Sequence, residues 1–151
     1  MKNAEIMKYV TYCGLYCRLC SQRGRIPQQA KALRDSMAKD GFDQWGRDMP
    51  NFKEFWVFLN QWSDVNNCCP GCRQGGGNPE CDIRQCARER NVEICTDCDD
   101  YPCQRISELG EVYPTLIADG QSLKKIGADK WITEQDKRAE TGFVYSDIRT
   151  L

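Results

Sequence analysis

Cysteine is the residue type in this sequence with the clearest capacity for chemistry. The chain of 151 residues contains eleven cysteines and no histidine. The cysteines fall into four clusters, which read CGLYCRLC (13–20), CCPGC (68–72), CDIRQC (81–86) and CTDCDDYPC (95–103). Three of these clusters contain a CxxC pair, a spacing that places two sulfurs close enough to share one metal ion. The spacing therefore predicts that thiolates bind metal.

The expected compartment favours metal ligation over disulfides. Glu5 and Lys8 interrupt the N-terminal segment where a secretory signal needs an apolar stretch, and no apolar run approaches the roughly 20 residues of a membrane-spanning helix. We therefore expect a cytoplasmic protein with no membrane partner. Thiols stay unpaired in that reducing compartment unless a metal or a redox cycle takes them, and an odd number of cysteines fits a closed disulfide framework poorly. Disulfides and unligated buried thiols are the alternatives.

The two middle clusters are predicted to form one complete metal site. Its ligands are Cys69, Cys72, Cys81 and Cys86, which are close together in the sequence. The Pro-Gly pair inside CPGC suits a tight turn that directs two sulfurs to one ion. Cys68 adjoins Cys69 and points another way in regular backbone, so we expect it not to be a ligand.

A second four-cysteine site is predicted to join the two outer clusters. The simplest ligand set combines their CxxC pairs, which are Cys17, Cys20, Cys95 and Cys98. Such a site would hold the N-terminal loop against residues 95–98 and would contribute its binding free energy to folding. Cys13 and Cys103 are further candidate ligands, which replace one of the four, bridge two ions or stay unligated.

Helical segments are expected between the cysteine clusters. Pro27 suits the first turn of a helix that ends near Gly41. A stronger pattern begins at Asn51, the expected N-cap, with Glu54 completing a capping box. The apolar side chains of this second helix predict a buried face, formed by Phe55, Trp56, Phe58, Leu59 and Trp62. An aromatic groove that binds a nucleotide or a peptide is the alternative.

The rest of the chain also reads as helical. Asp82 is expected to cap a short helix, and Pro102 to open another that runs through Leu109. Residues 113–140 read as two helices, with expected boundaries at Gly120, Gly127 and the N-cap Asp129. No segment shows the sustained alternation of a β-strand. We therefore predict a mostly α fold: one small domain, residues 1–151, of short helices with irregular, metal-held cysteine loops.

Four sequence phrases resemble those of a known family. CGLYCRLC, CPGC, CDIRQCARERNVEICTDC and DDYPC are similar, in this order, to the bacterial and archaeal family catalogued as domain of unknown function 3795. The resemblance spans roughly residues 12–133. It implies a cysteine-rich, zinc-binding cytoplasmic domain and attaches no activity to it.

Zinc is the expected metal, at about two ions per chain. All-cysteine tetrahedral sites hold zinc or iron, and separate CxxC pairs that meet favour zinc. An iron–sulfur protein with a [4Fe–4S] cluster is the alternative, because the outer clusters supply more sulfurs than one zinc ion needs. CxxxCxxC also occurs in radical S-adenosylmethionine enzymes, but this chain lacks the length and the strand pattern of their barrel.

A binding or adaptor module for an unidentified protein partner is the expected function. Four thiolates fill a zinc site and leave no position for a substrate, no histidine is present to act as a base, and no phosphate-binding loop or nucleophile motif occurs. These features speak against an enzyme. A nucleic-acid-binding zinc module is a further alternative, which the formal net charge of −1 disfavours, since thiolate ligation would make the protein more acidic still.

Overall fold

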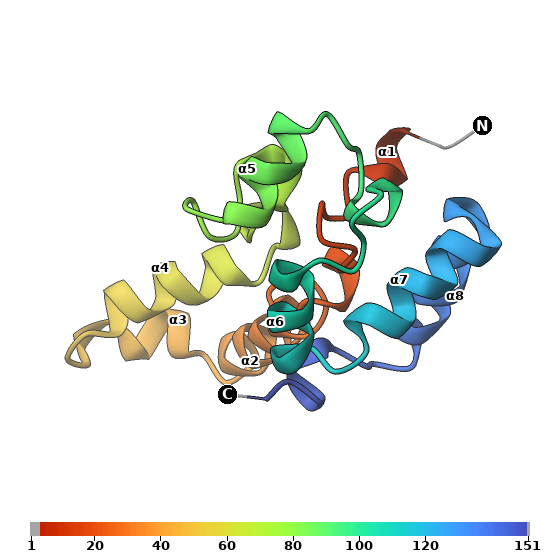
Figure 1. Ribbon diagram of the computed structural model, residues 1–151. Coiled ribbons are helices and arrows are strands. Elements are labelled where there is room, and N and C mark those ends of the chain that lie inside the picture. Colours follow the sequence, from red (N-terminus) through yellow and green to blue (C-terminus); the bar gives the residue numbers. More distant parts are fainter. Residues whose placement is uncertain (1–3, 151) are drawn as a thin grey trace.

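The computed structural model describes residues 4–150 and shows a mostly helical protein (Figure 1). The predicted fold class is therefore confirmed. The described residues form eight α-helices, which are α1 (Ala4–Met7), α2 (Ile26–Lys39), α3 (Phe42–Trp45), α4 (Phe52–Trp62), α5 (Asp82–Glu89), α6 (Gln104–Val112), α7 (Leu116–Ile126) and α8 (Ala128–Glu140). Residues 1–3 and 151 of the predicted domain lie outside the described residues.

Short 3₁₀ turns carry much of the chain between these helices. They are η1 (Cys17–Leu19), η2 (Gly46–Asp48), η3 (Val65–Asn67), η4 (Cys72–Gln74), η5 (Cys95–Asp97) and η6 (Tyr145–Asp147). The described residues contain no β-strand, and an isolated bridge joins Val10 to Tyr16. No helix among them combines the length and the apolar character that crossing a membrane requires.

The larger hydrophobic core joins the N-terminal segment to the two C-terminal helices. Trp131 and Tyr16 are fully buried in it, and their rings meet edge to face with centroids 5.9 Å apart. The Tyr16 hydroxyl donates to Asp136 Oδ1 over 2.7 Å, while its backbone N–H donates to the Tyr145 hydroxyl over 2.9 Å. Because Tyr16 is fixed from three sides, the backbone that leads into Cys17 is fixed as well.

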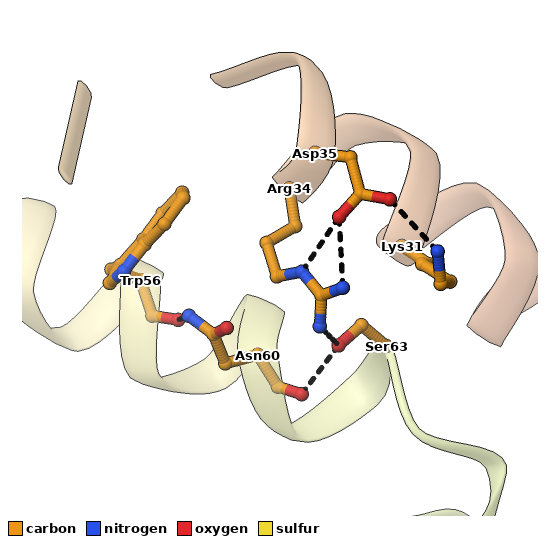
Figure 2. Close-up of polar contacts among 6 residues, drawn as sticks. All are labelled: Lys31, Arg34, Asp35, Trp56, Asn60 and Ser63. Atoms are coloured by element: carbon orange, nitrogen blue, oxygen red, sulfur yellow. Dashed lines mark hydrogen bonds and ion pairs between the residues drawn. The ribbon is translucent and has the colours of Figure 1, made fainter. Parts of the chain in front are cut away.

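Helices α3 and α4 lie at the left of Figure 1, away from α7 and α8, and α2 packs against both of them. Polar side chains contribute to the contact between α2 and α4, as Figure 2 shows. Arg34 of α2 pairs with Asp35 and donates to the Ser63 hydroxyl over 2.7 Å, and that hydroxyl donates to the Asn60 carbonyl. Ser63 follows α4 directly, so this chain of hydrogen bonds ties the end of α4 to α2.

The predicted buried face of α4 is largely wrong. Leu59 is buried, but Phe55 is 41% and Phe58 59% exposed. Phe52, seven residues before Leu59 and outside the predicted set, is the other buried side chain of this helix. Helix α4 packs on α2 along one narrow edge, so much of its apolar surface stays open.

Several predicted caps are also wrong, although the helices they mark exist. Asn51 occupies the N-cap position of α4 in a left-handed conformation (φ 62°), and its side chain makes no capping hydrogen bond, so the capping box does not form. Asp82 and Asp129 lie inside the first turns of α5 and α8, whose N-caps are Cys81 and Gly127. Each carboxylate therefore lies at the positive end of its helix without acting as the N-cap.

Gly120 does not break the helix, contrary to expectation. It lies inside α7, where a Cβ atom would stand 2.0 Å from the Tyr101 hydroxyl and 3.3 Å from the Thr96 side chain. The glycine therefore lets α7 approach the turn that carries Cys95 and Cys98, whereas the predicted break at Gly127 is observed.

Replacing Gly120 with alanine should lower the free energy of unfolding by about 1–3 kcal/mol, because the new methyl group overlaps the Tyr101 ring. Gly110→Ala in α6 is the matched control, since its methyl group would meet only the flexible Ile117 side chain at 3.2 Å. Urea denaturation of both variants measures the difference. Equal stabilities would contradict the close approach of α7 to Tyr101.

Candidate functional site

Two separate cavities are each lined by four cysteines. The first cysteine group, around a cavity of about 380 Å³, comprises Cys17, Cys20, Cys69 and Cys72. The second cysteine group, around a cavity of about 50 Å³, comprises Cys86, Cys95, Cys98 and Cys103. All eleven cysteines are unpaired in the structure.

This grouping differs from the sequence-based partition. Cys17 and Cys20 share a cavity with Cys69 and Cys72, rather than with Cys95 and Cys98. The N-terminal segment does contact the 95–98 turn, through a hydrogen bond from the Cys95 N–H to the Tyr12 carbonyl (2.7 Å). That contact lies several residues before Cys17, so the predicted neighbourhood is present while the predicted cysteine partners are different.

The remaining three cysteines line neither cavity. Cys13 and Cys81 pack around the smaller hydrophobic core of Ile83, Ile106 and Leu116, as do Cys95 and Cys103 of the second group. Cys68 is buried beside the end of α4, where its thiol donates to the carbonyls of Trp62 and Asp64. These hydrogen bonds agree with the expectation that Cys68 is not a ligand.

The two outer CxxC pairs have the same local structure. Each forms a 3₁₀ turn, η1 or η5, that starts from an extended residue and closes with a hydrogen bond from the last cysteine N–H to the first cysteine carbonyl. The closing N–H groups belong to Cys20 and Cys98, with distances of 3.1 and 3.0 Å. The CxxC spacing thus indicates a turn as well as a donor pair.

The CPGC loop approaches the η1 turn closely. A Cβ atom on Gly71 (φ 96°) would lie 3.3 Å from Cys17 Sγ, and the Cys72 N–H donates to the Cys17 sulfur. Both halves of the first cysteine group therefore meet at this sulfur, although some fifty residues separate them in the sequence.

The glycine run after CPGC folds back over Cys69. A Cβ atom on Gly76 would stand 2.7 Å from Cys69 Sγ and 2.9 Å from the Gly71 nitrogen. Arg84, buried at 6% exposure, holds this loop by donating to the carbonyls of Cys72, Gly76, Asn78 and Pro79. The glycines therefore let the loop close around a sulfur.

Arginine side chains contact the sulfurs of the second cysteine group. Arg90 donates to Cys98 Sγ over 3.3 Å and pairs with Asp100. Arg105 donates to Cys86 Sγ over 3.8 Å and pairs with Asp82. A cation beside a sulfur stabilises its thiolate form, which is the form that binds metal.

Burial and mutual repulsion govern the ionisation of the grouped thiols. Burial, and then the charges of Cys72 and Cys20, raises the pKa of Cys17 to about 12, against a lowering by the Cys72 N–H. Burial, and then the charges of Cys13 and Cys103, raises the pKa of Cys95 to about 12. The thiolates of each group therefore repel one another in the absence of a cation, and a bound metal ion would replace the protons.

The donor set fits a thiophilic metal, although the sulfurs do not form a finished site. Within residues 4–150, no three His, Cys, Asp or Glu side chains lie in an arrangement that could hold a metal ion. Each cysteine group nevertheless supplies four sulfurs, the number that a closed tetrahedral zinc site uses. Metal ligation by these residues stays a prediction.

A comparison with protein families matches residues 9–108 to the family described as "Protein of unknown function (DUF3795)". The chain belongs to the DUF3795 family. All eleven cysteines lie inside the DUF3795 match, which ends within α6 and excludes α7 and α8. The resemblance seen in the sequence is thus confirmed. The match ends at residue 108, whereas the resemblance was expected to reach about residue 133. No curated protein and no solved structure matches the chain.

Gly76→Ala should destabilise the protein by about 1–3 kcal/mol, because the added methyl group overlaps Cys69 Sγ and the backbone of Gly71. Gly75→Asn is the control, since Gly75 faces open space at φ 87° and asparagine tolerates a left-handed backbone. Chemical denaturation followed by circular dichroism compares the two. A Gly76→Ala variant as stable as the control would show that the loop does not close over Cys69.

Proposed function

We propose that this protein binds two zinc ions, one at each cysteine group, and works as a cytoplasmic binding or adaptor module for a protein partner. The observation that carries the proposal is the contact of Cys17 Sγ with the CPGC loop. Cys17 belongs to one CxxC pair, and its sulfur accepts the N–H of Cys72 from the other pair. A metal ion shared by the two pairs would bind at this sulfur.

The proposed sites retain seven of the eight predicted ligands and change their partners. The first ion takes Cys17, Cys20, Cys69 and Cys72, whereas the second takes Cys86, Cys95, Cys98 and Cys103. Cys103 thereby replaces Cys81, which lines neither cavity. Four sulfurs at each ion support structural metal sites, since a catalytic zinc ion keeps one position open.

An iron–sulfur cluster in the first cysteine group is the second candidate, and one observation favours it. The cavity at this group, about 380 Å³, is much larger than the cavity of about 50 Å³ at the second group. A cluster needs more room than a single ion, and cysteine thiolates hold it in the same way. Under this alternative, the first group carries iron and the second carries zinc.

Paired substitutions test which cysteines share an ion. Cys17→Ser, Cys69→Ser and the double variant should each lose the same one metal equivalent, because both residues serve one site. A Cys69→Ser/Cys98→Ser double variant should lose two equivalents. Elemental analysis of protein purified under reducing, oxygen-free conditions gives the number and the element, so iron in a brown protein would identify the cluster.

Cys68→Ser is the matched control and should keep the full metal content, because the Cys68 thiol donates to backbone carbonyls. Loss of two equivalents from the Cys17→Ser/Cys69→Ser double variant would restore the sequence-based partition. A wild-type protein that binds neither zinc nor iron would refute the proposed function.

A further inference from the structure

A third cavity, of about 510 Å³, opens beside the cysteine groups and contains none of the eleven cysteines. It lies between the first turn of α2 and the segment that follows α8. Its charged lining side chains are Arg18, Arg23, Arg25 and Glu140. The volume is within the range of small-molecule binding sites.

Three cations surround one aromatic ring at this cavity. The Tyr9 ring centroid lies 5.2 Å from Lys8 Nζ, 5.2 Å from Arg18 Cζ and 4.9 Å from Arg23 Cζ. Tyr9, Arg18 and Arg23 all line the cavity. Like charges gathered so closely repel one another and favour a bound anion.

Arg23 has the least compensated charge of the three. Lys8 pairs with Glu5, and Arg18 pairs with Asp136 over 3.1 Å. Arg23 forms no ion pair with a carboxylate of the described residues, and its Nη1 instead donates to the neutral Cys69 carbonyl over 2.6 Å. That bond fixes one corner of the guanidinium and leaves its other N–H groups for a ligand.

Asp136 is shared between Arg18 and Tyr16. The carboxylate oxygen that accepts from Arg18 also accepts from the Tyr16 hydroxyl over 2.7 Å. Arg18 is exposed and uses one amino group in this pair. Arg18 therefore lies over the same Tyr9 ring as Arg23 and has N–H groups to spare.

The other charged groups of the cavity have different roles. Arg25 forms a bidentate ion pair with Asp147 and donates to the Gly142 carbonyl, so it links the start of α2 to the segment after α8. Glu140 contributes the one carboxylate among the lining residues and opposes an anion. Arg25 is also the N-cap of α2, and Gln28 from the first turn of that helix lines the cavity as well.

We propose that this cavity binds a phosphate group, either as free phosphate or carried by a small organic molecule, between Arg23 and Arg18. Planar guanidinium groups match the oxygens of phosphate with parallel N–H bonds, and two cations suit its double charge better than the single charge of a carboxylate. The proposal does not require a bound metal ion, although both arginines adjoin the first cysteine group: Arg18 lies between Cys17 and Cys20, and Arg23 donates to the Cys69 carbonyl.

Titration calorimetry at fixed ionic strength tests the proposal with three probes: inorganic phosphate, glycerol 3-phosphate and adenosine 5′-monophosphate. Saturable binding of at least one probe is expected, with no binding of glycerol or adenosine. Equal affinities for all three would identify free phosphate as the ligand, whereas tighter binding of an organic phosphate would show that the cavity walls contact the rest of the molecule.

Three variants locate the binding. Arg23→Gln should weaken binding roughly 10- to 100-fold, as loss of a charge-assisted hydrogen bond does. Glu140→Gln should strengthen binding by about 2- to 5-fold, because it removes the opposing carboxylate. Since unfolding cannot raise affinity, this gain separates a site effect from general damage.

Arg149→Gln is the control outside the cavity and should bind as the wild type does, because Arg149 lies over the Tyr113 ring instead. Failure of all three phosphates to bind would overturn the proposal. Unchanged affinity in both Arg23→Gln and Glu140→Gln, or preference for an oligonucleotide over every small phosphate, would overturn it too.

Discussion

The contact between Cys17 Sγ and the CPGC loop is the constraint on which the arrangement of the cysteine segments depends. It brings together two segments that are far apart in the sequence. Gly71 has no side chain at the contact, and a Cβ atom there would lie 3.3 Å from Cys17 Sγ. Buried packing of Tyr16 against Trp131 fixes the segment on one side of the contact. Arg84 fixes the loop on the other side through four carbonyls.

Arginine takes the place of regular hydrogen-bonding partners in this fold. Loops expose backbone carbonyls that a sheet or helix would satisfy, and a guanidinium offers five donors in one planar group. Arg73 is an example: it donates to the carbonyls of Val10 and Glu93 and lies over the Tyr12 ring, so one side chain contacts separate parts of the chain. Two other arginines, Arg90 and Arg105, contact sulfurs, where their charge favours thiolates and hence metal binding.

The sequence predicted the helices better than it predicted their surroundings. Apolar periodicity and nearby polar residues located α5, α7 and α8 because those signals are local, although Asp82 and Asp129 do not act as the N-caps. The prediction that Gly120 breaks the helix was wrong. A glycine is needed there because the Tyr101 side chain, nineteen residues earlier in the sequence, packs against α7. The aromatic side chains of α4 looked like core, but α2 covers only one edge of that helix and leaves Phe58 exposed.

The same distinction applies to the candidate site. CxxC spacing identified the donor pairs and their turns, since each pair is a local structure. Which pairs meet depends on how the Tyr16 and Arg84 anchors orient segments far apart in the sequence, and no spacing encodes that. X-ray absorption at the metal edge of the reduced, purified protein tests whether cysteine sulfurs surround each metal ion. About four sulfur neighbours are expected around each metal at about 2.3 Å. A metal surrounded by nitrogen or oxygen would contradict it.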